Sequence, residues 1–381
     1  MLQPRLHHAM KLKYTNPANI NLSEILPFES IVGNLDINQL PMIPNAETFP
    51  LWKPDGEFSF LHESAVIAFH GIIFCSWYNC RVNELRDFTP IRGCFSKDSG
   101  KSWSAVETLG ADPSGKLLYC PPVYAIVNDT LYLLMNTMVS ADHIHSLETY
   151  RYDEATGKFT FVRSDPIPFK LNTNAYHLDN GKLLLPGRLA KLDGFPVTPA
   201  VMISDSGSAE GPWRIVKIQS NGLLPDGSSY VHPELSAIVK GRDITIFCRN
   251  DNRQVPILYH SHDYGETWSG PIEHDIFFSN SKIYSGTLSD GRNYLIGNII
   301  RSDDAKGRRS RLALFFSEPG SLIFNRGWLL RDGYDAKLNL HPQWSYPCAY
   351  EWNHRLYIIY TMVTDPQAPQ KRGAMMSIVQ L

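Results

Sequence analysis

Ionisable and aromatic residues stand at the two ends of several apolar runs in this sequence. Such side chains are costly to bury unless they are hydrated or bound to a ligand. Any one of the tyrosines or asparagines is typical of a residue that lines a core, but carboxylates, arginines and tyrosines gathered on one surface could bind a polar ligand. The residues that open runs are His62, Glu63, Tyr124, Tyr176, His177, His232, Glu234, Tyr284 and Tyr346, and those that close runs are Asn79, Asn136, Arg188, Arg249, Asn250, Asn298, Arg301 and Thr361.

The runs that carry these residues are predicted to be β-hairpins. Each consists of two apolar segments joined by a short polar turn, and the turn dipeptides HG, ND, NG, KG, DG and NH favour hairpins. The segments are apolar on both faces, as expected of sheets that stack face to face. The six hairpins begin near positions 63, 123, 174, 234, 284 and 346.

A repeated turn gives the period of the architecture. The segments 96–103 and 261–268 both read S-x-D-x-G-x-[ST]-W, in which the aspartate can accept backbone N–H bonds, the glycine supplies a positive φ and the tryptophan folds back as an apolar plug. Weaker copies place acidic residues at 153, 205 and 318, so with Asp98 and Asp263 the steps run from 52 to 58 residues. A period of this length with four strands per unit is typical of a β-propeller blade.

The predicted fold class is therefore all-β, a six-bladed β-propeller, with seven blades as the alternative. The last hairpin is followed by too few residues for a full blade, and a closed ring cannot leave unpaired strand edges. We therefore expect an N-terminal strand within residues 29–37 to close the last blade. In this interpretation residues 1–55 form an N-terminal lead segment with the closing strand, and residues 56–381 form a single propeller domain.

Composition narrows the classes of partner. The chain has 36 Lys and Arg against 38 Asp and Glu, so no overall field attracts nucleic acid or an acidic membrane. No apolar run reaches the roughly 18–20 residues that cross a bilayer, and no signal peptide is visible, which predicts a cytoplasmic protein if the N-terminus is native and a periplasmic or secreted one otherwise. The six cysteines lie without metal-type spacing, mostly in strand-like runs, so we expect buried thiols and neither a metal nor another cofactor. The sequence leaves the oligomeric state open.

These motifs resemble the sialidases and related BNR or Asp-box propellers over roughly residues 60–380. The repeated turn resembles the Asp-box of that family. The resemblance implies that His232-Pro-Glu234 carries the glutamate partner of a tyrosine nucleophile, that Ser345-Tyr346-Pro347 carries the nucleophile, and that Arg249 is the second arginine of a carboxylate-binding triad. It implies Arg311 or Arg309 as the third arginine, with Arg301 as the next candidate.

Two positions depart from the family pattern. His62 and Glu63 stand where the family has its first arginine, and imidazole does not replace a bidentate guanidinium group without loss. The acid/base residue should come from the loop after the first hairpin, where Asp87 lies at about the right distance and Glu84 competes with it.

Three functional hypotheses follow, all with a carbohydrate as the partner. The first is an exo-acting retaining glycoside hydrolase for an acidic sugar at a non-reducing end, with substrate contacts from Arg249, Arg311, Arg309, Arg301, His62, Glu63, Arg188, Tyr176 and Tyr284. The second is a polysaccharide lyase that acts on uronic acids, for which Tyr176, His177 and Arg188 with His143 and His145 are candidates. The third is a non-catalytic glycan-binding propeller.

Overall fold

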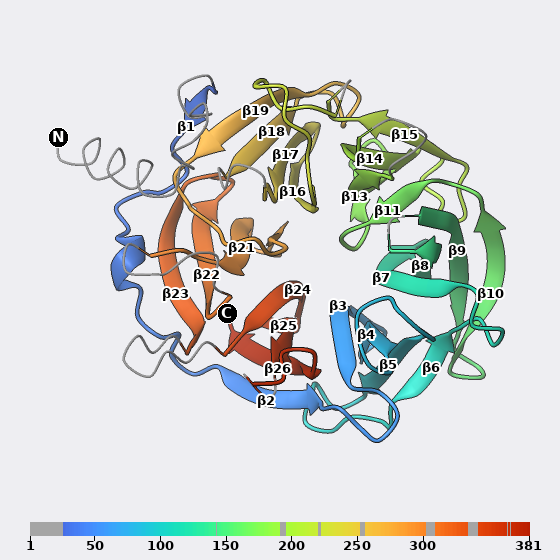
Figure 1. Ribbon diagram of the computed structural model, residues 1–381. Helices are drawn as coiled ribbons and strands as arrows, with labels where there is room; N and C mark the ends of the chain where they lie inside the picture. The colour runs from blue at the N-terminus through green and yellow to red at the C-terminus, as the bar shows by residue number, and fades with distance from the viewer. Residues whose placement is uncertain are drawn as a thin grey trace.

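The apolar hairpins assemble into a ring of sheets around a central axis (Figure 1). The computed structural model describes residues 26–141, 143–190, 196–219, 222–251, 256–301, 309–333, 342–363, 365 and 367–381. Within these residues the strands form six sheets, which we number as blades 1 to 6 from the first hairpin onward. The prediction of six blades, rather than seven, is confirmed.

In blades 1, 2, 3 and 5 the chain runs from the strand nearest the axis to the outermost strand, and in blades 4 and 6 a strand from the lead segment lies outside the last of the consecutive strands. Blades 1 to 3 contain β3 (Phe60–Phe69), β4 (Ile72–Cys80), β5 (Ile91–Ser96) and β6 (Glu107–Gly110); β7 (Leu118–Val127), β8 (Thr130–Ser140), β9 (His143–Asp153) and β10 (Lys158–Asp165); and β11 (Phe169–Leu171), β12 (Tyr176–His177), β13 (Leu183–Leu189), β14 (Thr198–Ser204) and β15 (Trp213–Lys217). Blades 4 to 6 contain β16 (Leu235–Lys240), β17 (Asp243–Cys248), β18 (Ile257–Ser261) and β19 (Ser269–His274); β20 (Tyr284–Thr287), β21 (Arg292–Asn298), β22 (Arg311–Pro319) and β23 (Phe324–Asp332); and β24 (Trp344–Trp352), β25 (Arg355–Val363) and β26 (Arg372–Gln380).

The lead segment closes the ring, but at a different place from the one predicted. The strand that pairs antiparallel with β26 is β2 (Glu47–Trp52), not a strand in residues 29–37. Residues 28–29 instead form β1 (Phe28–Glu29), which adds in parallel to β19, and the short 3-10 helix η2 (Ile37–Gln39) follows. The apolar residues that suggested a strand, among them Ile31 and Val32, pack against the core of blades 4 and 5, so their hydrophobicity reflects burial there.

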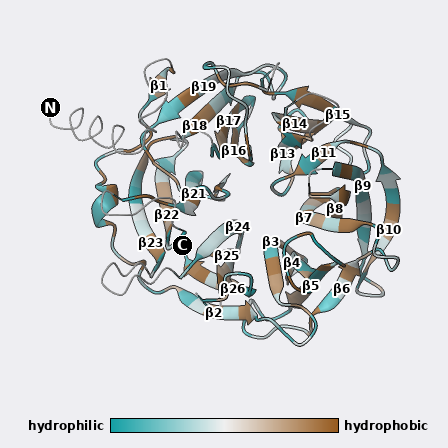
Figure 2. Ribbon diagram, in the orientation of Figure 1, coloured by the Kyte–Doolittle hydropathy of each residue, from teal (hydrophilic) through white to brown (hydrophobic). Residues whose placement is uncertain are grey.

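The core lies between the blades, as the two-faced hydrophobicity predicts. All ten residues of β3 are buried. Figure 2 shows apolar residues concentrated on inner and middle strands such as β8 and β14, and hydrophilic residues along outer strands such as β10. All six cysteines are buried with free thiols. No helix among the described residues is long and apolar enough to span a bilayer.

The two full copies of the repeated turn have the same geometry. Ser96 Oγ accepts a bond from Gly100 N at 2.8 Å and donates to Asp98 Oδ1 at 2.8 Å, and Ser261 repeats both contacts in blade 4 at the same distances. A Cβ on Gly100, whose φ is +89°, would meet Ile378 of blade 6 at 2.8 Å. These turns therefore pack one blade onto the preceding one and do not face the axis.

Removal of the serine hydroxyl should weaken this joint between blades. We expect Ser96→Ala and Ser261→Ala each to lower the free energy of unfolding by about 1–2 kcal/mol, because a buried glycine N–H loses its acceptor. Chemical denaturation measures the change, and Ser164→Ala, at an exposed serine of β10, is the control. Variants as stable as the control would show that the serine does not hold the turn.

Candidate active site

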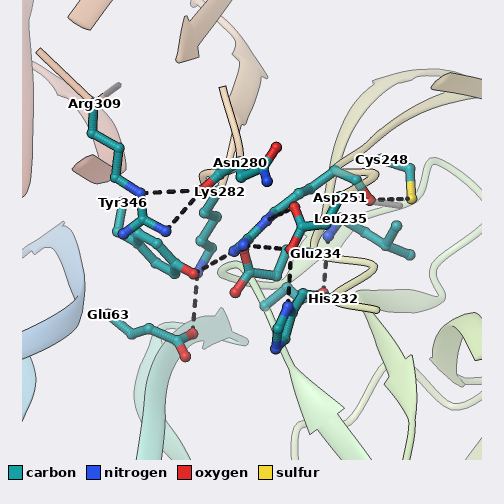
Figure 3. Close-up of polar contacts among 12 residues, drawn as sticks. Glu63, His232, Glu234, Leu235, Cys248, Asp251, Asn280, Lys282, Arg309 and Tyr346 are labelled. Atoms are coloured by element: carbon teal, nitrogen blue, oxygen red, sulfur yellow. Dashed lines mark hydrogen bonds and ion pairs between the residues drawn. The ribbon is translucent and has the colours of Figure 1, made fainter. Parts of the chain in front are cut away.

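Two residues in strained backbone conformations mark one end of the ring of inner strands. Glu63 and Tyr346 have φ of +45° and +58°, values that are costly for a non-glycine residue and that cluster at functional sites. Each lies near the start of an innermost strand, in β3 and β24, where the strand pairing has a bulge. Figure 3 shows both side chains extending toward Lys282 from the neighbouring blades 6 and 1. We call this end of the ring the Tyr346 mouth.

A single guanidinium nitrogen connects the tyrosine with a carboxylate. Arg249 Nη1 donates to the Tyr346 hydroxyl at 2.6 Å and to Glu234 Oε2 at 2.8 Å. All three side chains are buried. The structure thus brings together Tyr346 of blade 6 with Glu234 and Arg249 of blade 4; Figure 3 shows Tyr346 and Glu234 in this group.

The charges around the tyrosine fix the protonation states of this group. Burial alone would raise the pKa of Glu234, but Arg249, Arg188 and Lys282 hold it at about 2, so the side chain is a carboxylate at neutral pH. Burial and the charge of Glu234 raise the pKa of Tyr346 well above its ordinary value, against the opposing effect of Arg249 and Arg309. Tyr346 is therefore a neutral phenol that must lose its proton to act as a nucleophile.

Asp251, which was not predicted as a site residue, binds the other two guanidinium nitrogens of Arg249. Its two carboxylate oxygens accept bonds from Arg249 Nε and Nη2, both at 2.7 Å, and Oδ2 also lies 2.9 Å from His232 Nδ1. Burial raises the pKa of Asp251, but the bonds to His232 and Arg249 lower it further, so the net pKa is below its usual value. Because Nε, Nη1 and Nη2 all have partners in the protein, Arg249 orients Tyr346 and Glu234. Asp251 could not be found from the sequence, because a carboxylate two residues after a strand-closing arginine is ordinary in a loop.

His62 and Arg309 pack on the tyrosine ring. The ring centroids of His62 and Tyr346 are 3.8 Å apart, and His62 Nδ1 lies 2.9 Å from Thr361 Oγ1. The Arg309 guanidinium lies 5.2 Å from the ring centroid of Tyr346 and donates to Asn280 O. His62 thus supports the tyrosine ring and is itself held by Thr361.

The buried imidazole should make the protein sensitive to acid. Burial, followed by the charges of Arg372 and Arg309, lowers the pKa of His62 well below 6.5. The unfolded chain therefore binds a proton at this residue that the folded chain does not, and stability falls as the pH drops below about 6.5, by up to about 1.4 kcal/mol per pH unit.

Denaturation of His62→Gln between pH 7 and pH 5 should show a shallower pH dependence than the wild type. His143→Gln, at an exposed histidine, is the control and should keep the wild-type slope. Equal slopes for wild type and His62→Gln would mean that the folded protein accommodates a protonated His62.

Glu63 pairs with two lysines that sequence reasoning also missed. Lys170 Nζ lies 3.6 Å from Glu63 Oε1, and Lys282 Nζ lies 3.8 Å from Glu63 Oε2. Lys170 is paired in register with Arg188 across β11 and β13. Lys170 was hidden because the inner strand of blade 3 is split into β11 and β12, and the hairpin pattern was aligned to the second piece.

The two acid/base candidates lie in the loop between β4 and β5. Glu84 Oε1 accepts a bond from the buried Tyr78 hydroxyl at 2.8 Å, whereas Asp87 Oδ1 accepts one from the backbone N of Arg81 at 3.1 Å. The Tyr78 ring packs edge-on against His62. Contacts through Tyr78 and His62 therefore link Glu84 to Tyr346, while Asp87 shapes the loop.

Two other predicted arginines have partners outside the Tyr346–Glu234 group, and two predicted tyrosines lie toward the opposite end. Arg311 forms an ion pair with Asp332 at 3.4 Å between the adjacent strands β22 and β23, and Arg301 donates to Leu40 O in the lead segment. Tyr176 and Tyr284 line a cavity of about 470 Å³ together with residues from the second halves of the inner strands, which places them toward the opposite mouth. The reason is that β20 is short and β12 is the second piece of a split strand, so the first residues of these strands, Tyr284 and Tyr176, lie farther along the axis than the first residues of the long inner strands.

Several of the strand-closing asparagines join blades. Asn136 bonds with the backbone of Phe169 and Leu171 in the next blade, at 2.9 and 2.8 Å, and Asn298 Nδ2 donates to Trp344 O at 2.7 Å. Asn79 donates to Phe60 O within blade 1. Tyr124 is buried within β7. These contacts satisfy backbone groups at the blade junctions, so the asparagines serve the fold.

The residues suggested for a lyase are not assembled. Tyr176 pairs in register with Leu184, four residues along β13 from Arg188, which is roughly 13 Å at the rise of a strand. His143 and His145 belong to β9, the third strand of blade 2.

No group of three or more His, Cys, Asp or Glu side chains within the described ranges could hold a metal.

Comparison with known proteins agrees with this architecture. Solved structures with a similar fold include Trypanosoma rangeli sialidase in complex with the inhibitor DANA (12% identity, TM-score 0.68, covering 88% of this chain and 60% of that one) and Hadza microbial sialidase Hz136 (13%, 0.67, 88% and 68%). A K499G mutant of NanB sialidase from Streptococcus pneumoniae has 13% identity and a TM-score of 0.59, with 87% and 70% covered. The chain spans about 60% of the length of the Trypanosoma rangeli sialidases it matches.

A sequence search of curated proteins gave no match. The family model described as "BNR repeat-like domain" matches residues 71–358. This match covers about three quarters of the chain and includes both full copies of the repeated turn. The chain therefore belongs to the BNR repeat-like domain family, and its fold is similar to that of the sialidases compared above.

Proposed function

We propose that this protein is an exo-acting, retaining glycoside hydrolase that removes an acidic sugar from the non-reducing end of a glycan. The observation that carries the proposal is the buried group in which Arg249 Nη1 bonds both the Tyr346 hydroxyl and the Glu234 carboxylate. A phenol is a poor nucleophile at neutral pH and needs a base close by. Glu234, kept ionised by its cationic neighbours, is the carboxylate available for that purpose.

In the first step, the Tyr346 oxygen attacks the anomeric carbon and its proton passes to Glu234. The bond from the anomeric carbon to the leaving oxygen breaks, and Glu84 protonates that oxygen. In the second step a water molecule, activated by Glu84, cleaves the glycosyl–tyrosine bond and the proton returns from Glu234 to the phenolate. Two displacements at the same carbon retain its configuration. Arg309, against the ring of Tyr346, stabilises negative charge on the phenol oxygen.

Tyrosine suits a substrate with a carboxylate next to the reacting carbon, because attack by a neutral group avoids repulsion between like charges. Similar solved structures include Trypanosoma rangeli sialidase in complex with sialic acid and its covalent intermediate with 2,3-difluorosialic acid. These complexes belong to the trypanosomal enzyme, and they support the substrate class proposed for this chain.

A panel of aryl glycosides of acidic sugars, together with uronic-acid polysaccharides, tests the proposal. We expect release of the aryl group from at least one acidic glycoside and none from the neutral glycoside of matching aglycone. Formation of an unsaturated, ultraviolet-absorbing product without aryl release would identify a lyase instead. Binding of acidic glycans without turnover would identify a glycan-binding propeller.

A further inference from the structure

Two buried lysines pair with one carboxylate beside the Tyr346–Glu234 group, and an arginine in register with one of these lysines adds a third cation. Lys170 and Arg188 come from blade 3, Lys282 comes from the segment before β20 in blade 5, and Glu63 comes from blade 1. We call Lys170, Arg188 and Lys282 the basic cluster. Arg188 and Lys282 both lower the pKa of Glu234, and Figure 3 shows Lys282 reaching toward Glu63 alongside Tyr346, so the cluster lies next to the proposed nucleophile.

The hydrogen-bonding capacity of the basic cluster is largely unused by the part of the chain that the structure describes. Both ion pairs to Glu63, at 3.6 and 3.8 Å, are longer than a hydrogen bond. Arg188 Nη1 is buried and has no hydrogen-bond partner among the described residues. Each ammonium group carries three donors, so a ligand with several acceptor oxygens would find them available.

Arg249 differs from the basic cluster in this respect. Its guanidinium donates to Asp251 twice, to Glu234 and to Tyr346, all within 2.8 Å. A substrate carboxylate could bind Arg249 only by displacing these partners. The basic cluster offers donors without such a loss.

Charge balance in the basic cluster also favours an anionic ligand. The side chains of Lys170 and Lys282 are only 8% and 4% exposed, and a single carboxylate is shared between them. Burial would lower the pKa of Lys170, but Cys120 and Glu63 raise it above its ordinary value, so the amine stays charged. Buried cations in excess of their partners are stabilised by a bound anion.

We propose that the basic cluster binds the carboxylate of the acidic sugar and takes over the recognition that an arginine clamp would otherwise provide, with Arg249 as a positioning residue. This inference rests on the proposed function for the presence of an acidic sugar at the Tyr346 mouth. Glu63 competes with the sugar carboxylate for the same ammonium groups and weakens its binding.

Binding of free sugars by calorimetry tests the assignment independently of turnover. The probes are sialic acid and glucuronic acid, with galactose and glucose as neutral counterparts and inorganic sulfate as a simple oxyanion. Lys170→Met, Arg188→Met and Lys282→Met each remove one charge with little change in length, and each single lysine variant leaves Glu63 with the other lysine. Lys240→Met, at an exposed lysine that donates to Gly320 O, is the matched control.

We expect each Met variant to bind its preferred acidic sugar on the order of tenfold more weakly, the loss of one charge-assisted hydrogen bond, and Lys282→Arg to retain most of the affinity. Glu63→Gln should bind the acidic sugar more tightly, a gain that structural damage would not produce. Unchanged affinity in all three Met variants, weaker binding by Glu63→Gln, or sulfate bound as tightly as either sugar acid would overturn the assignment.

Failure of this inference and failure of the proposed function give different results. If the wild type hydrolyses an acidic glycoside and the three Met variants keep its KM, the hydrolase stands and the basic cluster is not its anion site. If the wild type binds sugar acids through the basic cluster but hydrolyses no acidic glycoside, the anion site stands and the hydrolase does not.

Discussion

Replacement of Tyr346 by Phe should lower kcat at least about 10³-fold on any acidic glycoside that the wild type hydrolyses, because the variant has no nucleophilic oxygen. The phenyl ring keeps the packing against His62 and Arg309, so the fold should persist. Steady-state kinetics with the aryl glycoside measures the effect. The substrate affinity should change little, since the hydroxyl is not assigned to substrate binding.

Tyr360→Phe is the matched control for this experiment. Tyr360 is a buried tyrosine of the same blade whose hydroxyl lies 2.9 Å from Ser377 Oγ and not at the Tyr346 mouth. Its loss should reduce stability slightly and leave kcat within about twofold of the wild type. A Tyr346→Phe enzyme with the turnover of this control would exclude the tyrosine as the nucleophile.

Replacement of Arg249 by Met should produce the largest loss of stability, about 3–5 kcal/mol, because two buried carboxylates lose their cationic partner. Glu234 and Asp251 would remain at the Tyr346 mouth without the four bonds that Arg249 donates to them and to Tyr346. Activity should fall together with stability, since Tyr346 and Glu234 are no longer held at a common nitrogen.

The pH dependence of stability should separate this effect from a simple packing defect. In the wild type Glu234 titrates at about 2 when folded, so its contribution is present above about pH 4.5 and is lost as the pH falls toward 2. In Arg249→Met the folded protein should favour the protonated acid, and the deficit relative to wild type should shrink between pH 7 and pH 5.

Arg214→Met provides a surface comparison with the same kind of partners. Arg214 also bonds two carboxylates, Asp205 and Glu266, but its side chain is 36% exposed. Exposed ion pairs contribute about 1 kcal/mol or less, so this variant should stay close to wild type. If both arginine variants lost the same free energy in denaturation experiments, burial at the Tyr346 mouth would not be the source of the effect.

The sequence contained enough to predict the ring and the central pair of the site. Hairpin turns recur once per blade, and the repeated turn occurs in two full and three weaker copies at a step of 52 to 58 residues. Equivalent positions of successive blades must therefore face the same mouth. Glu234 and Tyr346 were found because both lie near the start of a hairpin, and Arg249 because it follows the second strand of its hairpin.

The remaining residues were hidden by local irregularities of the blades. Lys170 lies in one piece of a split inner strand, and Lys282 lies just before the short strand β20, so neither occupies the position that the repeat predicts. The closing strand was misplaced because Ile31 and Val32 are apolar for a different reason, their packing on blades 4 and 5. Contacts across the ring, such as Glu63 with both lysines, join residues more than 100 positions apart that no local pattern connects.

The central claim is that the Tyr346 oxygen bonds to the anomeric carbon of the substrate. A fluorinated analogue of the enzyme's preferred acidic sugar slows the second displacement and should trap the covalent intermediate. Intact mass measurement and peptide mapping then show which residue carries the glycosyl group. We expect a mass increase of one glycosyl group, located on the peptide that contains Tyr346 and absent from Tyr346→Phe. A glycosyl group on any other residue, or inversion at the anomeric carbon without a covalent adduct, would contradict it.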